Sequence, residues 1–232
     1  MDCDRFRRTR KALPLAVTLA LLCACGAGTG EIAPTVSLAP TAARPGAGYA
    51  SVLLEEAPFF DMDSQGETTL AALLEELSGG WTQVEVSRFA VVDLDGGGPE
   101  VLLWLAAGSD PDHGFEVLRE AEGRVLGYSF TYRSFGELKA DGSFWVSGGA
   151  SDYGVGVLRF AEDAWSIQRT ASCVSTVGEN GEEVLTYFVD GAAAEEEAFQ
   201  AACQAQEEKE DALWRPFTQE ELESAFQEKE GR

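Results

Sequence analysis

The chain has 232 residues, of which 40 are acidic and 17 basic, so its formal net charge at pH 7 is −23. A field of this sign repels nucleic acid and anionic lipid head groups, which excludes nucleic acid as a partner. Hydrophobic residues make up 45% of the chain, enough for a globular domain that buries a core of its own.

Residues 1–24 are typical of a leader that is removed from the mature protein. Five basic residues between positions 5 and 11 precede the apolar run Ala12–Leu22, which is too short to cross a bilayer as a helix. The run ends in Leu22-Cys23-Ala24-Cys25, and this pattern resembles the lipobox of bacterial lipoproteins. The resemblance implies attachment of a diacylglyceryl group to the Cys25 thiol and cleavage before it. The alternative is an ordinary signal peptide with a chance cysteine.

Residues 25–48 are rich in Gly, Ala, Pro and Thr and have no periodic apolar pattern, which indicates a flexible tether. We expect a single β-rich globular domain over residues 49–232. Removal of the leader leaves 12 basic and 38 acidic residues, a net charge of −26. The lipid at Cys25, rather than the protein surface, would then hold the domain at the extracytoplasmic face of the membrane. Cationic ligands, divalent ions and neutral glycans stay open as partners, and we expect a monomer.

The folded region begins with Tyr49–Phe60, which we expect to supply an apolar edge. Leucines at helical spacing predict a helix over Thr68–Leu77, ended by Gly79–Gly80. Asp141-Gly142 and Asn180-Gly181 predict type I′ hairpin turns. Period-two patterns and turn signals predict strands at 84–92, 100–106, 114–120, 123–132, 143–147, 154–161, 164–170 and 183–189.

The stretch Ser87–Ala106 is the centre of this pattern. Two strands that are apolar on both faces flank an acidic, glycine-rich turn, Asp93–Glu100, so they should lie at the centre of a covered sheet. Val117–Glu122 recurs in part as Val157–Glu162, a spacing of 40 residues that is typical of propeller blades. Two copies do not close a ring, so two similar hairpins in one antiparallel meander are the preferred interpretation.

The C-terminal part is predicted to be helical. Ala193–Asp211 is an acidic helical segment, and Thr218 with Glu221 forms a capping box for a second helix that ends near position 229. The predicted fold class is therefore α+β and mainly β: an antiparallel meander or sandwich-like sheet, with a partial propeller as a variant. One N-terminal helix and two C-terminal helices complete it.

Together with GFEVLRE (114–120) and SGGASDYGVG (147–156), the central element resembles a group of secreted lipoproteins of Gram-positive bacteria with a single strand–DxDGDGxxE–strand unit. The resemblance implies location and architecture rather than an activity. It also relates the turn to the calcium loops of repeat proteins. Asp93 and Asp95 match the first two ligand positions and Glu100 is a third candidate, but Gly97 stands where a further Asp is expected. The alternative, which we favour, is a structural turn in which Asp93 and Asp95 accept backbone N–H bonds and glycines take positive φ.

Cys173 and Cys203 are the cysteines that remain beside Cys25 after processing. In an oxidising compartment they can form a disulfide, whereas a helical position facing inward would make Cys203 a buried free thiol. Both interpretations stay open.

No catalytic residue is predicted. His113 is the only histidine, so zinc ligation and a histidine-based triad lack partner motifs. We expect no cofactor apart from the calcium alternative. The function expected from the sequence is that of a non-enzymatic, lipid-anchored domain that binds an unidentified extracellular ligand or protein. A calcium-stabilised module and a cell-wall or glycan hydrolase are the alternatives.

Overall fold

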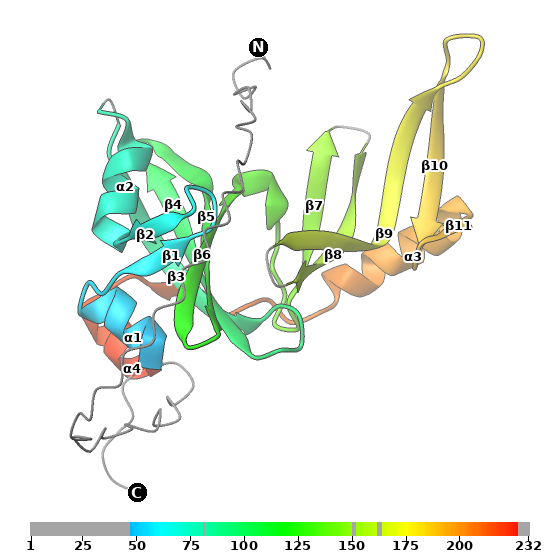
Figure 1. Cartoon of the computed structure of the whole chain (residues 1–232). Helices are drawn as coiled ribbons and strands as arrows, with labels where there is room; N and C mark the ends of the chain where they lie inside the picture. Colours follow the sequence, from blue (N-terminus) through cyan, green and yellow to red (C-terminus); the bar gives the residue numbers. More distant parts are fainter. Residues whose placement is uncertain (1–46, 81, 150–151, 162–163, 227–232) are drawn as a thin grey trace, which may run out of the picture. The chain divides into compact units, whose positions relative to one another are not determined.

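The computed structural model describes residues 47–80, 82–149, 152–161 and 164–226, which form two β-sheets and four α-helices (Figure 1). The protein is mainly β, with helices in its N- and C-terminal parts, as the sequence predicts. The predicted leader, Cys25 and nearly all of the predicted tether lie outside the described residues.

The described chain begins with helix α1 (Ala47–Leu54), within the stretch that we expected to supply an apolar edge. The sequence analysis did not predict this helix, although Tyr49, Val52 and Leu53, at positions i, i+3 and i+4, are all buried on one of its faces. Two short strands, β1 (Phe59–Asp61) and β2 (Gly66–Thr68), follow. The predicted leucine helix is confirmed as α2 (Leu70–Ser78), with Thr69 as its N-cap and Gly79 in the left-handed conformation after it.

The larger sheet has seven strands in the order β12-β3-β4-β5-β6-β1-β2. Its central strands are β3 (Val84–Asp93), β4 (Pro99–Ala107), β5 (Asp110–Ala121) and β6 (Arg124–Thr131), and β12 (Arg215–Pro216) lies at one edge. Neighbouring strands from β12 to β6 pair in antiparallel orientation, but β1 pairs with β6 in parallel. Strands β3 to β6 form the predicted antiparallel meander, and the sheet is mixed because the parallel pairing joins segments more than 60 residues apart, for which the sequence has no local signal.

The second sheet has five antiparallel strands in the order β11-β10-β9-β8-β7. They are β7 (Ser143–Gly149), β8 (Asp152–Phe160), β9 (Trp165–Val177), β10 (Glu183–Val189) and β11 (Ala192–Ala194). The 3₁₀ helix Tyr132–Ser134 follows β6. Neither sheet of the described residues closes on itself, so the propeller variant is wrong, and the two copies of the weak repeat lie in different sheets.

Both predicted type I′ turns are wrong, because only their glycines have positive φ. Asn180-Gly181 lies in a five-residue connection, since Val177 pairs with Glu183. Gly142 lies against the carbonyl oxygen of Asp93 so closely that a Cβ would clash. Two other dipeptides have positive φ at both residues, as type I′ requires: Glu122-Gly123 between β5 and β6, and Asp190-Gly191 between β10 and β11.

The C-terminal part contains α3 (Glu196–Glu207) and α4 (Gln219–Phe226), which confirms two helices with α3 shorter than expected. Strands β3 and β4 have apolar clusters on both faces, as predicted. Phe89 and Leu103 pack with α1, α2 and α4, whereas Ala90 and Leu102 share a cluster with residues of the second sheet, including Phe144. Strands β3 and β4 thus lie between two hydrophobic cores and contribute side chains to both.

Candidate functional site

The acidic turn between β3 and β4 is held by its own side chains. The Gly96 N–H donates to Asp93 Oδ1 at 2.6 Å, and the Gly97 N–H donates to Asp95 Oδ1 at 2.8 Å. Gly96 and Gly98 have φ of 85° and 138°, which an L side chain rarely adopts. These are the features that the structural-turn interpretation predicts.

Glu100 lies at the end of the same turn and is buried. Its Oε2 accepts the Leu94 N–H at 2.9 Å. Burial raises the pKa of Glu100 to about 7, against the opposing effect of the Leu94 hydrogen bond; the neighbouring Asp95 raises it further. The hydrogen bond between Leu94 and the buried Glu100 carboxyl group therefore joins the two ends of the turn.

The three predicted metal candidates lie close together. One carboxylate oxygen from each of Asp93, Asp95 and Glu100 lies within 4.8 Å of the other two. However, four of their six oxygens already accept hydrogen bonds, three from backbone N–H groups and one from the Arg119 guanidinium. Calcium takes six to eight oxygen ligands. Three side chains, one of which is paired with a guanidinium, supply fewer ligands than calcium takes and do not fit a resident calcium ion.

Cys173 on β9 and Cys203 on α3 are both buried, and both are free thiols in the structure. They belong to one apolar cluster with Val155, Ala171 and Phe199, so the fold brings the predicted pair into the same core. Burial is the largest influence on each thiol and raises both pKa values. A disulfide between them stays a prediction.

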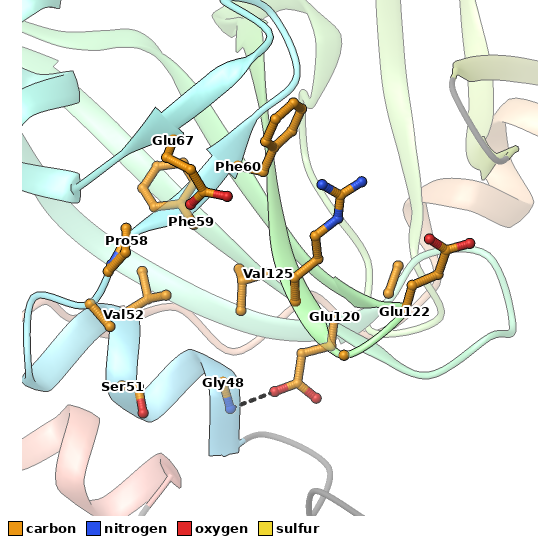
Figure 2. A pocket seen from close by; sticks show the side chains of 14 residues that line it. Gly48, Ser51, Val52, Pro58, Phe59, Phe60, Glu67, Glu120, Glu122 and Val125 are labelled. Carbon is orange, nitrogen blue, oxygen red and sulfur yellow. Dashed lines mark hydrogen bonds between the residues drawn. The ribbon is translucent and has the colours of Figure 1, made fainter. Parts of the chain in front are cut away.

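A groove that the sequence did not predict lies beside α1, β1 and the β5–β6 turn, with a volume of about 530 Å³ (Figure 2). Its apolar walls come from α1 and the segment after it and from the start of β6. They include Val52, Ala57, Pro58, Phe59 and Val125.

Charged groups stand around these apolar walls. Glu67 comes from β2, Glu120 from the end of β5 and Glu122 from the β5–β6 turn (Figure 2). Arg124 is the one cation among the lining residues, and its guanidinium lies 4.7 Å from the centroid of the Phe60 ring. The Gly48 N–H donates to Glu120 Oε1 at 2.7 Å, which ties the start of α1 to the end of β5. The groove thus combines an apolar interior with an excess of negative charge.

Sequence reasoning missed this groove because its lining comes from three separate segments. The one local signal is the pair of glutamates that flanks Ala121 just before Gly123. Glu122 has φ of 53°, a left-handed conformation that costs a glutamate more than it costs glycine or asparagine.

No helix among the described residues is long and apolar enough to span a bilayer. Comparison of the chain with protein-family models, with curated proteins and with solved structures gives no match.

Proposed function

We propose that this protein is a lipid-anchored extracytoplasmic lipoprotein, attached through Cys25, whose domain binds a small organic cation with an apolar body. The observation that carries the ligand class is the groove beside α1, in which apolar walls are combined with three carboxylates and a single guanidinium. The lipobox-like sequence before Cys25 supports the anchor.

The size and lining of the groove suit a small molecule. Ligand pockets have volumes of about 300–1,000 Å³ and combine apolar walls with a few polar groups that orient the ligand. The Ala57, Pro58 and Phe60 side chains offer accessible apolar surface. Glu67 and Glu122 are exposed carboxylates at the rim. A ligand ammonium group would interact with these carboxylates while its apolar part displaces water from the walls.

The charge of the whole protein supports the same ligand class. With a net charge of −23 for the full chain, the protein attracts cations and repels anions over distances of about a Debye length.

Calorimetric titration with n-hexylammonium, n-hexanol and hexanoate tests the proposal, because these probes share an alkyl chain and differ in charge. We expect the ammonium to bind most tightly and hexanoate least tightly. Glu122→Gln should weaken ammonium binding about twofold to fivefold, as expected for an exposed ion pair. Glu85→Gln is the matched control, since Glu85 is exposed on β3 and does not line the groove.

Equal affinity for the three probes would show that the carboxylates do not select the ligand. An ammonium affinity lowered equally by Glu122→Gln and Glu85→Gln would show that only the overall charge matters. Either result overturns the proposed ligand class.

A further inference from the structure

The β9–β10 hairpin exposes apolar side chains on both of its faces. Val177, at the end of β9, is 80% exposed, and Val184 and Leu185 on β10 are 41% and 45% exposed. Successive side chains of a strand point to opposite faces, so the exposed Val184 and Leu185 side chains lie on opposite faces of the hairpin, at neighbouring positions of β10. Helix α3 covers this sheet only further along, where Phe199 packs against Tyr187.

The same part of β10 has an open edge. Strand β11 pairs only with Tyr187, Phe188 and Val189, at the end of β10 remote from the β9–β10 loop (Figure 1). Val189 and Ala192 flank a two-residue turn and therefore exchange both hydrogen bonds. Because backbone groups alternate in direction along a strand, the N–H and C=O groups of Leu185 point to the same side as those of Val189. On this side of β10, no strand of the described residues pairs with Leu185.

This edge lacks three features that commonly prevent strand addition, namely lysine, proline and a bulge. Natural proteins protect edge strands with lysine, proline or a bulge. Residues 174–186 contain no lysine, arginine or proline, and the pairing of β10 with β9 is regular from Glu183 to Val189. An apolar, unprotected edge with regular geometry is suited to receive a further strand.

The charge of the hairpin decides which kind of strand it can receive. Glu179 and Glu182 lie in the loop between β9 and β10, and the net charge of residues 174–186 is negative. A second copy of this chain in antiparallel pairing would bring this acidic loop toward the Glu195–Glu197 segment of its partner. Like charges placed opposite each other destabilise a strand pair, so the edge favours a basic partner over self-association.

We propose that the open edge of β10 at Val184–Thr186 is a docking surface for an extended, basic segment of another protein. The segment pairs with the Leu185 backbone as an added strand. Its apolar side chains contact Val184 on one face and Leu185 on the other, and its basic side chains lie near the acidic loop. This surface shares no residue with the groove beside α1, so a test of one proposal does not decide the other.

The test uses a short synthetic peptide of alternating Lys and Val, titrated into the ¹⁵N-labelled protein and followed by amide chemical shifts. A second peptide has the same sequence but carries an N-methyl group on every backbone nitrogen, which keeps the charge and removes the donors of both of its edges. We expect the first peptide to shift amides of residues 174–186 and the second to bind about tenfold more weakly, the loss expected from about 1.4 kcal/mol of hydrogen bonding.

Variants of Leu185 test the surface from the protein side. Leu185→Pro removes the outward N–H without removing a bond to β9, and proline is tolerated on edge strands. Leu185→Ser keeps the backbone and removes the apolar side chain, so it remains informative if the proline variant does not fold. Leu213→Ser is the matched control, because Leu213 is another exposed leucine, at 68%, outside the hairpin. We expect Leu185→Ser to weaken binding and Leu213→Ser to leave it unchanged.

Equal binding of the two peptides would reduce the interaction to non-specific attraction to an acidic protein and overturn the proposal. Shifts confined to the groove beside α1 would also overturn it. Concentration-dependent dimerisation that Leu185→Pro abolishes would assign the edge to a second copy and overturn the choice of a basic partner.

Discussion

Arg119 on β5 donates to Asp95 in the β3–β4 turn, with 2.9 Å between Nη1 and Oδ2. The two side chains are only 22% and 10% exposed, and the same guanidinium lies 4.3 Å from the centroid of the Phe160 ring on β8. A cation from the protein itself therefore compensates part of the negative charge of the turn. The turn is tied to the neighbouring strand by protein groups.

This arrangement predicts that calcium does not stabilise the protein selectively. A specific site at a calcium concentration 1,000 times its Kd would raise the free energy of unfolding by about 4 kcal/mol. We expect only the small screening effect that any divalent ion has on an acidic protein, so Mg²⁺ at equal ionic strength should reproduce it. Thermal unfolding in Ca²⁺, Mg²⁺ and EGTA measures this. A calcium-selective rise in melting temperature that Asp95→Asn abolishes would show that the turn binds the ion after all.

Glu116 predicts a specific pH dependence of stability. This residue on β5 is completely buried; its Oε2 accepts from Ser129 Oγ at 2.7 Å, and its Oε1 has no hydrogen-bond partner among the described residues. Burial raises the pKa of Glu116 from 4.5 to about 8; the Ser129 hydrogen bond opposes this, and Asp61 and Asp63 add to it. The folded protein therefore retains a proton that the unfolded chain releases.

The free energy of unfolding should consequently fall as the pH rises from 4.5 to about 8, by at most ~1.4 kcal/mol per pH unit from this group. Glu116→Gln keeps the shape and cannot ionise, so it should make the profile less steep and leave the slope that Glu100, with a pKa of about 7, contributes. Urea denaturation across the range measures the effect, with Glu85→Gln as a control that loses an exposed carboxylate. Parallel profiles for the wild type and Glu116→Gln would mean that Glu116 ionises normally in the folded protein.

The two buried thiols give a prediction about reactivity. Since burial protects Cys173 and Cys203 and raises their pKa values, both should react slowly with iodoacetamide in the native protein. Both should react completely after unfolding without a reductant. Peptide mapping of the alkylated protein, prepared from an oxidising compartment, distinguishes the outcomes. Thiols that react only after reduction would establish the disulfide, which would contribute about 3 kcal/mol by the chain-entropy model.

The anchor is tested at Cys25, which lies outside the described residues. Cys25→Ala should release the protein into the medium or leave it unprocessed, because no acyl chain can then be attached. Membrane fractionation and mass spectrometry of the N-terminal peptide measure this, and Cys23→Ala is the matched control within the same motif. An unchanged membrane fraction with no lipid mass on the wild-type peptide would contradict the lipoprotein assignment.

The amino-acid sequence by itself determined the elements whose signals are local. The spacing of Leu70, Leu73 and Leu77 predicted α2, and the apolar strands around Asp93–Glu100 predicted β3 and β4 at the centre of a covered sheet. These predictions succeed because the burial of a helix face or a strand depends on residues a few positions apart.

Only the tertiary structure decided which elements pair and what they enclose. The parallel pairing of Phe60 with Leu126 places β1 beside the β5–β6 hairpin, and this pairing brings α1, Glu67 and Glu122 around one groove. The division of the strands into two sheets leaves the edge of β10 open beyond β11. Such pairings join residues far apart in the chain, and their stability comes from side chains packed across that distance, so no local pattern of residues specifies them.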